Sequence, residues 1–403
     1  MAQAKLSREV GVALLLFYGL GNILGAGIYV LVGKVVSISG YYSVFAFALA
    51  CMIAFFTALS YMELASRYPV SAGVAVYVEE GIGFRPLSIG LGLLIATAGL
   101  ASAATIAHGF AGYLSQFLQM DKELAILFLI TVLVAISIAG IKLSVIIASV
   151  MTVVEIVGLL IIIYYGFDTI TTPKIPFSSF IPQFSFSDLS VIVLGAFLAF
   201  YAFLGFEDMV NIAEEVKEPS KTFPIAITLA LAISTLLYIL IVIVALETLS
   251  IEELKRSEAP FADIYTRLTG EGPVLISLIG SFAVVNGALI QMIMASRIIY
   301  GMSAKGWLPS LFSKISVKTK TPVYSTIFVG AVTIALSLLF DIVSLASYSS
   351  MLILIVFTAV NISLIRIKSS SIAPKGVIQL PLWMPWTGVI LNFFLIIMTL
   401  SLG

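Results

Sequence analysis

The strongest constraint in this chain is a series of long, continuous apolar runs. The hydrocarbon core of a bilayer is about 30 Å thick, and a helix needs about 20 apolar residues to cross it. Strands of a membrane barrel are shorter and alternate in polarity, so these runs predict helices. The eleven candidate spans are residues 10–37, 40–65, 86–118, 123–140, 143–166, 188–211, 223–247, 272–302, 323–340, 342–366 and 384–402.

Composition excludes the common soluble classes. Of the 403 residues, 61% are hydrophobic and only 10% are charged, whereas an average soluble domain carries about 25% charged residues. A soluble enzyme and a disordered protein are therefore excluded. The 21 basic and 21 acidic residues balance, so no net field attracts a nucleic acid. The sequence predicts an all-α, multi-pass membrane protein whose surroundings are the lipid bilayer.

Cysteine and histidine are too rare for a metal or haem centre. The chain has one cysteine, Cys51, and one histidine, His108. No intrachain disulfide and no cysteine-based metal site can form from them. We expect no cofactor, apart from a coupling ion, H⁺ or Na⁺. No soluble domain is evident, and residues 1–403 are expected to form a single transmembrane domain.

The basic residues set the expected orientation. Loops on the cytoplasmic side are enriched in Lys and Arg. With the N-terminus inside, 15 of the 21 basic residues fall in inner segments. The first run is too long for a signal peptide and is expected to be kept as a span. An odd number of spans then places the C-terminus outside, in a protein expected in the plasma membrane.

Two spans contain glycine-rich stretches. The first carries Gly19, Gly21, Gly25 and Gly27 within nine residues, which is a poor composition for a helix. Small residues let membrane helices pack closely. They also permit an unwound stretch at mid-membrane, where free backbone groups and a half-helix end bind polar substrates. Both interpretations of the first span stay open on the residues alone.

The sixth span carries the second break. Gly205 stands between aromatic residues, and Glu207 and Asp208 follow it. Spans one and six open two successive sets of five spans, and an odd repeat must run inverted relative to its copy. The sequence predicts inverted repeats at about 8–166 and 188–366, with an extra helix at about 384–402.

Four ordered motifs carry a family resemblance, over about residues 8–325. Each lies at or after a predicted span: one in the first, one after the second, one in and after the sixth, and one at the end of the eighth. The chain resembles the amino acid–polyamine–organocation superfamily, especially its cationic-amino-acid-transporter-like members. The motifs are Gly-Ala-Gly-Ile-Tyr-Val at 25–30, Glu-Leu-Ala-Ser-Arg-Tyr-Pro at 63–69, Phe-Leu-Gly-Phe-Glu at 203–207 with Glu-Glu-Val-Lys-Glu-Pro at 214–219, and Ser-Arg-Ile-Ile-Tyr-Gly-Met at 296–302.

The resemblance implies a fold and a substrate site. The fold is a five-plus-five inverted repeat with about 11 membrane helices, of which the first and sixth are unwound at mid-membrane. Backbone amides at the first break would bind the substrate carboxylate, and carbonyls at both breaks would bind its amino group. Two phenylalanines of the sixth span are candidates for an aromatic gate. The implied substrate-binding residues are Asn22, Gly25, Ala26, Gly27, Tyr201, Ala202, Phe203, Leu204 and Phe206. Separately from the resemblance, Gln291 of the eighth span is a candidate because it is a polar residue within an apolar span.

Ionisable groups inside the spans are candidates for coupling or gating. Some proton-coupled members of the superfamily carry a lysine in the fifth helix, and the aligned residue here is Ile146. Glu155 lies nine residues further on. It is expected to form either a structural hydrogen bond or a proton-coupling site, and His108 leaves the same two alternatives. Glu207 and its neighbour Asp208 are expected at an inner gate with Arg67 or Arg297, or at a solvated helix end.

The predicted function is secondary active transport of an amino acid by alternating access. An exchanger of amino acids or polyamines is the alternative, because the absent lysine leaves the coupling open. A channel and an intramembrane enzyme are less favoured. A channel filter usually requires rings of polar groups around a pore, and the adjacent carboxylates Glu207 and Asp208 point about 100° apart on a helix. The sequence gives neither the substrate, the oligomeric state nor the direction of transport.

Overall fold

The computed structural model describes most of the chain. The described residues are 10–69, 73–139, 141–183, 185–304, 306–316, 319, 321–372, 374 and 376–402. Within these ranges, the side chains of residues 26, 141–149, 211, 212, 214 and 215 are not described. The side chain of Ile146 therefore lies outside the described part of the molecule.

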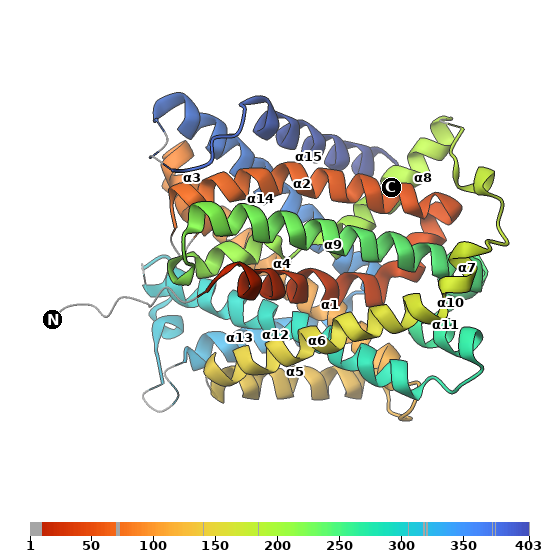
Figure 1. Ribbon diagram of the computed structural model, residues 1–403. Coiled ribbons are helices and arrows are strands. Elements are labelled where there is room, and N and C mark those ends of the chain that lie inside the picture. Colours follow the sequence, from red (N-terminus) through yellow and green to blue (C-terminus); the bar gives the residue numbers. More distant parts are fainter. Residues whose placement is uncertain are drawn as a thin grey trace.

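Eleven long apolar helices, counted over the described residues, form one bundle (Figure 1). Each matches one of the spans predicted from the apolar runs, and most bounds agree within a few residues. The sixth span differs most, because its regular helix stops early and continues as 3-10 turns. The helices are α1 (Val12–Ser39), α2 (Ser43–Arg67), α4 (Arg85–Leu114), α5 (Lys122–Ala139), α6 (Ile141–Tyr165), α8 (Phe186–Phe200) with the 3-10 segments η3 (Tyr201–Phe203) and η4 (Phe206–Glu215), α9 (Pro219–Thr248), α12 (Val274–Ala304), α13 (Val323–Leu339), α14 (Ile342–Ser370) and α15 (Trp383–Leu402).

Short helices cover the two ends of the bundle. We call these ends the Val12 end and the Ser39 end, after the first and last residues of α1. Figure 1 shows α3 at the Val12 end and α7, α10 and α11 at the Ser39 end. The short elements are η1 (Gly40–Tyr42), α3 (Gly73–Ile82), α7 (Phe167–Thr171), η2 (Phe177–Phe180), α10 (Ile251–Arg256), α11 (Pro260–Thr269) and η5 (Ser310–Ser313).

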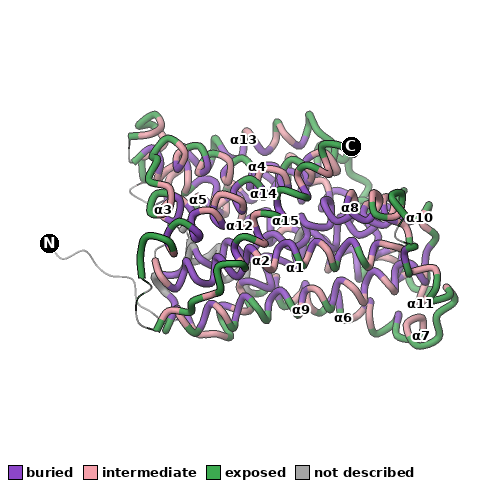
Figure 2. The backbone as a smooth tube through the Cα atoms, turned by 90° about the horizontal axis from the view of Figure 1, so that it is seen from above, coloured by how far each residue is buried: buried purple, intermediate pink, exposed green. Residues whose placement is uncertain are grey.

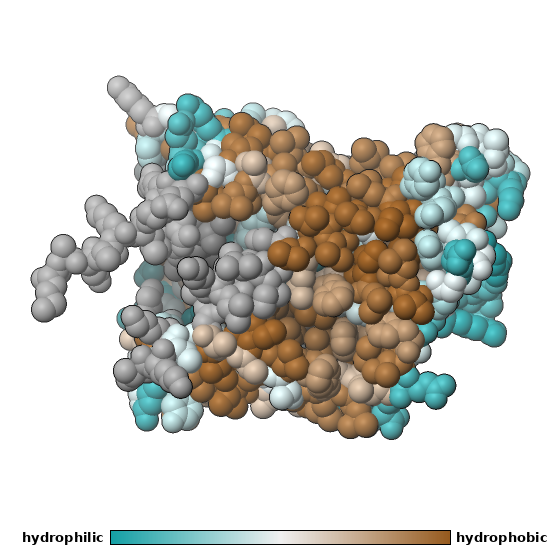
Figure 3. All heavy atoms as spheres, turned by 60° about the horizontal axis from the view of Figure 1, so that its bottom comes forward, coloured by the Kyte–Doolittle hydropathy of each residue, from teal (hydrophilic) through white to brown (hydrophobic). Residues whose placement is uncertain are grey.

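The surface of the bundle has the polarity of a membrane protein. Figure 3 shows a broad hydrophobic band around the middle of the viewed face, with hydrophilic residues toward both ends. Eight helical segments of the described chain are long and apolar enough to cross a membrane, and shorter apolar helices lie in α1, α6 and α13. The chain is therefore a multi-pass membrane protein.

Helix α1 lies near the centre of the bundle. It packs against α9, α12, α8 and α6, while α12 packs mainly against α4. Figure 2 shows buried segments through the middle of the molecule and exposed ones at its rim and ends. Glycines and other small residues on α1 allow the neighbouring helices to pack closely against it. The central helix is thus in contact with most of the elements that a substrate site would need.

Side-chain caps stabilise the starts of two helices, the short α10 and the spanning α14. Ser250 and Glu253 make a reciprocal capping box at the start of α10, which satisfies two backbone donors that a helix start leaves free. The Ser250 backbone amide and hydroxyl, together with Arg267, lower the pKa of the Glu253 carboxyl to about 2. At the start of α14, Asp341 accepts hydrogen bonds from the amides of Val343 and Ser344.

A buried ion cluster ties three elements together at the Val12 end. The Glu63 carboxylate on α2 is fully buried and accepts hydrogen bonds from Arg67 at 2.6 Å and from Lys368 of α14 at 2.8 Å. The backbone amide of Leu380, before α15, donates to the same carboxylate at 2.9 Å. Lys368 also donates to the Leu380 carbonyl. One carboxylate therefore anchors α2, α14 and the segment leading into α15.

Candidate functional site

The predicted break in the sixth span is present. Helix α8 ends at Phe200, η3 follows, and Leu204 is extended before Gly205 takes a φ of 124°. Only glycine adopts such a positive φ without strain. The Gly205 amide, freed from a helical partner, is bonded by the Glu207 carboxylate at 2.8 Å. The residue that permits this interruption of the helix is the glycine that the sequence singled out, and unwinding of the span at mid-membrane stays a prediction.

The break in the first span is not observed in this structure. Helix α1 runs from Val12 to Ser39 as one helix, and amides within such a helix bond to carbonyls four residues earlier. Its glycines instead permit close packing, which was the alternative interpretation. A Cβ on Gly25 would lie 3.0 Å from both the Ala283 carbonyl oxygen and the Glu155 carboxylate. Unwinding at Gly25–Gly27 stays a prediction, and the Ala26 side chain lies outside the described residues.

Residues 22–27 of α1 and residues 202–205 at the break after α8 run past each other in opposite directions near the centre of the bundle. A Cβ added to Gly27 would lie 2.1 Å from the Cα of Ala202. Five residues earlier on α1, Asn22 lies against Gly205, where an added Cβ would meet the Asn22 backbone carbon at 2.8 Å. The Tyr238 hydroxyl of α9 lies 2.6 Å from the Ile23 carbonyl oxygen and 2.8 Å from the Ala202 carbonyl oxygen. This one donor is shared between the two carbonyls and links the two segments.

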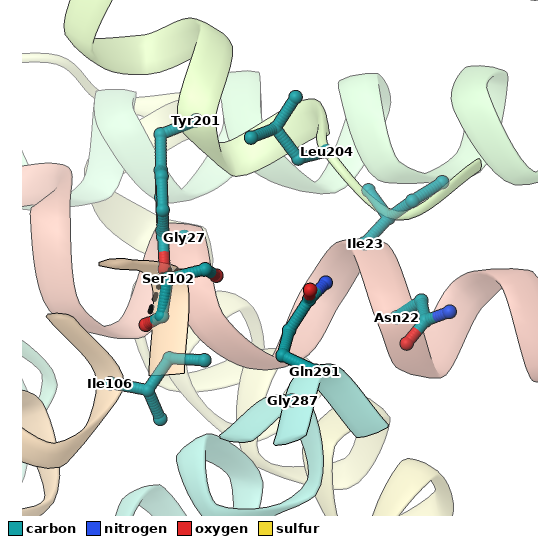
Figure 4. A pocket seen from close by; sticks show the side chains of 9 residues that line it. All are labelled: Asn22, Ile23, Gly27, Ser102, Ile106, Tyr201, Leu204, Gly287 and Gln291. Carbon is teal, nitrogen blue, oxygen red and sulfur yellow. Dashed lines mark hydrogen bonds between the residues drawn. The ribbon is translucent and has the colours of Figure 1, made fainter. Parts of the chain in front are cut away.

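A small cavity lies beside this crossing. Its volume is about 10 Å³, which is room for roughly one water molecule. Figure 4 shows side chains from α1, α4, η3 and α12 around it. Five residues that the sequence implicated line the cavity, namely Asn22, Gly27, Tyr201, Leu204 and Gln291. Of the others, Gly25, Ala202, Phe203 and Phe206 do not, and the Ala26 side chain is outside the described part of the chain.

Four lining residues escaped the sequence analysis. Ser102 and Ile106 of α4 lie one helical turn apart, as do Gly287 and Gln291 of α12, and Ile23 follows Asn22. The Tyr201 hydroxyl donates to the Ser102 carbonyl at 3.1 Å, and the Ser102 hydroxyl lies 2.8 Å from the Tyr201 oxygen. For Gly287 the available signal was its place one helical turn before the polar Gln291, and for Ser102 it was a polar residue within an apolar span; Ile23 and Ile106 carry no such signal.

The two candidate gate aromatics are packed away from the cavity. The Phe203 ring lies 5.2 Å from Tyr238 and 6.4 Å from Phe47. The Phe206 ring lies 5.2 Å from Phe357 and 5.8 Å from Tyr61. Ring pairs at these separations contribute packing energy beyond simple burial. In this structure both rings pack in aromatic clusters, and their role as a gate stays a prediction.

The carboxylates after the break are buried. Glu207 is 8% exposed and Asp208 is 1% exposed, so the expectation of a solvated helix end is wrong. The pairing with Arg67 is also wrong, because Arg67 bonds its own helical neighbour Glu63. Asp208 instead accepts a hydrogen bond from the amide nitrogen of Gln291 at 3.2 Å, and the Asn22 amide nitrogen lies 3.5 Å away.

Glu155 lies on the other side of α1. Its carboxylate accepts a hydrogen bond from Asn286 of α12 at 2.9 Å, and its backbone carbonyl accepts one from the Tyr29 hydroxyl at 2.6 Å. The second carboxylate oxygen and the Asn286 side-chain oxygen are buried without a hydrogen-bond partner. The expected structural hydrogen bond is present, and it leaves one side of this carboxyl unsatisfied.

His108 contacts the neighbouring helix near the Ser39 end. Its Nε2 lies 3.1 Å from the carbonyl oxygen of Phe340, which directly follows α13. This is the helix–helix hydrogen bond expected of a lone histidine in a span. The contact accounts for one ring nitrogen, and the alternative role in coupling stays a prediction.

Comparison with known proteins assigns the family. The sequence profile of the amino acid permease family matches residues 11–401. The chain is 28% identical to the vacuolar cationic amino acid transporter 4 of Arabidopsis thaliana, over 93% of this chain but only 65% of that protein. In Bacillus subtilis it is 26% identical to the methylthioribose transporter, over 94% of this chain and 86% of that one. It is 25% identical to the branched-chain amino acid permease BcaP of the same species, over 91% and 82%. Because the profile covers nearly the whole chain, the protein belongs to the amino acid permease family.

Proposed function

We propose that this protein transports an amino acid across a membrane by alternating access, with the substrate held at the crossing of α1 and η3. The observation that carries the proposal is the cavity at this crossing, where two inverted glycine segments meet and polar side chains converge. Discontinuous or glycine-rich helices from two repeats commonly build such midplane sites. Residues 8–166 and 188–366 are the proposed repeats, and α15 is the extra helix.

Substrate entry requires the lining groups to separate. The cavity holds about 10 Å³, and even the smallest amino acid is several times larger than one water. We assign the substrate carboxylate to the amides of Gly25, Ala26 and Gly27, which become free donors when α1 unwinds there. Its amino group is assigned to the carbonyls of Asn22, Tyr201, Ala202 and Leu204. Tyr238, which now engages the Ile23 and Ala202 carbonyls, would release them on binding.

The direct test is transport by the purified protein in liposomes. We expect saturable uptake of at least one labelled amino acid, and faster exchange when unlabelled substrate is inside. Imposed sodium and proton gradients are applied separately, to distinguish symport from exchange. The protein is proposed to lie in the plasma membrane with its N-terminus cytoplasmic and its C-terminus outside. Failure to move any amino acid or amine would overturn the functional proposal.

Glu155 is the proposed proton-coupling residue. A carboxyl buried beside α1 with one oxygen unsatisfied is a costly arrangement when charged, so gain and loss of a proton would change its contacts with Asn286 and Gly25. The substitution Glu155→Gln keeps the shape and the Asn286 hydrogen bond but cannot titrate. We expect it to abolish uptake driven by an acidic exterior while exchange at equal pH persists.

The matched control is His108→Gln, which removes a second ionisable group among the coupling and gating candidates His108, Glu155 and Glu207. Because the Nε2 atom of His108 lies 3.1 Å from the backbone carbonyl oxygen of Phe340, a helix–helix contact accounts for this residue, and proton-driven uptake by the variant should remain. Both variants are measured in liposomes at a series of outside pH values. An unchanged pH dependence in Glu155→Gln would show that the coupling residue lies elsewhere.

A further inference from the structure

The Asp208 carboxylate lies directly behind the cavity, and the proposed substrate contacts do not include it. It rests on η4, just past the Gly205 break, and is 1% exposed. Its recorded side-chain partners are the amide nitrogens of Asn22 at 3.5 Å and Gln291 at 3.2 Å. Both of these residues line the cavity. Two neutral amides therefore separate a buried carboxylate from the space where a substrate would lie.

This carboxylate differs from the buried Glu63 in its charge balance. Glu63 is neutralised by Arg67 at 2.6 Å and Lys368 at 2.8 Å. Among the described residues, no salt bridge reaches Glu207 or Asp208. The Glu207 carboxylate accepts a hydrogen bond from the Gly205 backbone amide at 2.8 Å. Burying a carboxylate without a cation is costly, so a positive charge that reaches Asp208 would be stabilised there.

A second group near these carboxylates is also unsatisfied. The Tyr61 hydroxyl on α2 is fully buried and has no hydrogen-bond partner, while its ring packs on Phe206. A buried hydroxyl without a partner can be satisfied by an ordered water, by a ligand or by a rearrangement of its neighbours.

We propose that Asp208 is the counter-ion for a positively charged ammonium group of the substrate, reached when the Gln291 or Asn22 amide moves aside. This rests on the proposed function and adds a specificity-determining residue to it. An ammonium donor brings a full positive charge that the neutral amide donor lacks, and a buried carboxylate is compensated by a cation that is both paired and hydrogen-bonded to it. Gln291 rises from α12 toward α1 in Figure 4 and is the amide with the shorter contact to Asp208.

The distances along α1 permit two sources for this ammonium. Asn22 lies five residues before Gly27, which corresponds to about 7.5 Å along a helix. The α-ammonium lies only about 2.5 Å from the carboxylate carbon, so it reaches the Asn22 level only if the substrate carboxylate is bound nearer to Asn22 than Gly27 is. An extended lysine side chain, at about 6 Å from Cα to nitrogen, reaches the same level. The shared chemistry is an ammonium group, and the experiment separates the two sources.

The test measures binding and transport by Asp208→Asn in the purified full-length protein. Thermal stabilisation is recorded with leucine, lysine, pentane-1,5-diamine and the hydroxy acid analogue of leucine, because a ligand of the native state raises the melting temperature. If the α-ammonium is recognised, affinity for leucine and lysine falls by about tenfold or more. If the side-chain ammonium is recognised, only lysine and the diamine are affected. The hydroxy acid, which lacks an ammonium, should be insensitive to the substitution.

Two further variants keep the result interpretable. Asp208→Glu retains the charge and should recover most of the lost affinity, which a merely structural role would not require. Asp168→Asn makes the same chemical change at an exposed position on α7 and should bind as the native protein does. Affinities of Asp208→Asn within about twofold of native for every amine would overturn the proposal. Absence of amino acid uptake by the native protein would instead overturn the transport function, since amine-dependent stabilisation is read independently.

Discussion

Replacing Glu63 by glutamine is expected to lower the melting temperature by on the order of 5 °C or more. The carboxylate is fully buried and is the partner of both Arg67 and Lys368, whose side chains are 4% and 12% exposed. Glutamine removes the negative charge and leaves two cations close together in a buried site. Breaking a buried ion pair by removing one partner costs about 3–5 kcal/mol. The measurement is thermal unfolding of the purified protein in detergent.

An exposed ion pair provides the control. Glu252→Gln removes the partner of Arg256 at the Ser39 end, where the two side chains are 60% and 80% exposed. Surface pairs contribute little, so this variant should melt as the native protein does. Combining Glu63→Gln with Lys368→Met removes one of the two stranded cations and should restore part of the loss. Equal melting temperatures for Glu63→Gln and Glu252→Gln would show that the cluster does not hold these helices together.

Substituting Gly27 by valine is expected to abolish transport. A Cβ at this position would lie 2.1 Å from the Cα of Ala202, which is backbone and cannot rotate away. The α1–η3 crossing must therefore separate, and overpacking of a tight core costs about 1–3 kcal/mol or more. Because the cavity lies at this crossing, uptake in liposomes should be lost even where the protein still assembles in the membrane.

Gly90 on α4 is the matched control for Gly27. Nothing lies within 4 Å of the place where its Cβ would be, so Gly90→Ala should transport normally. Ala202→Gly in the Gly27→Ala background removes the Ala202 methyl, at 2.4 Å, but leaves the Cα at 2.1 Å. Recovery should accordingly be incomplete. Native uptake by Gly27→Val would show that the two segments need not approach closely during transport.

The membrane-spanning elements could be predicted from the sequence because length and apolarity are local properties. The fourth predicted span, 123–140, is α5 from Lys122 to Ala139, and the last, 384–402, is α15 from Trp383 to Leu402. The Gly205 break was also local, since the residue that permits a positive φ is itself the signal. The glycines of α1 also indicated a possible break, but α1 is one continuous helix in this structure. Glycine favours close helix packing as well as backbone breaks.

The partners of the charged residues were not predictable in this way. Arg67 was one of two arginines considered as partners of Glu207 and Asp208, besides a solvated helix end. It bonds Glu63 one turn away, and Lys368, 305 residues after Glu63 in the chain, shares that carboxylate. Ser102 was overlooked because a single serine in an apolar span usually bonds its own helix. Its contact with Tyr201 exists only because α4 and η3 are brought together.

The sequence by itself determined the class of protein, the number and limits of its helices, and the position of one backbone break. The helices follow from the high free-energy cost of unpaired backbone N–H and C=O groups in lipid, because each spanning segment must satisfy these groups with its own helical hydrogen bonds. Only the tertiary structure shows that Gly27 lies against Ala202, and that no salt bridge of the described residues reaches Asp208 behind the cavity. These depend on which helices pack together. Contacts between residues far apart in the chain determine that packing, and no single segment contains them.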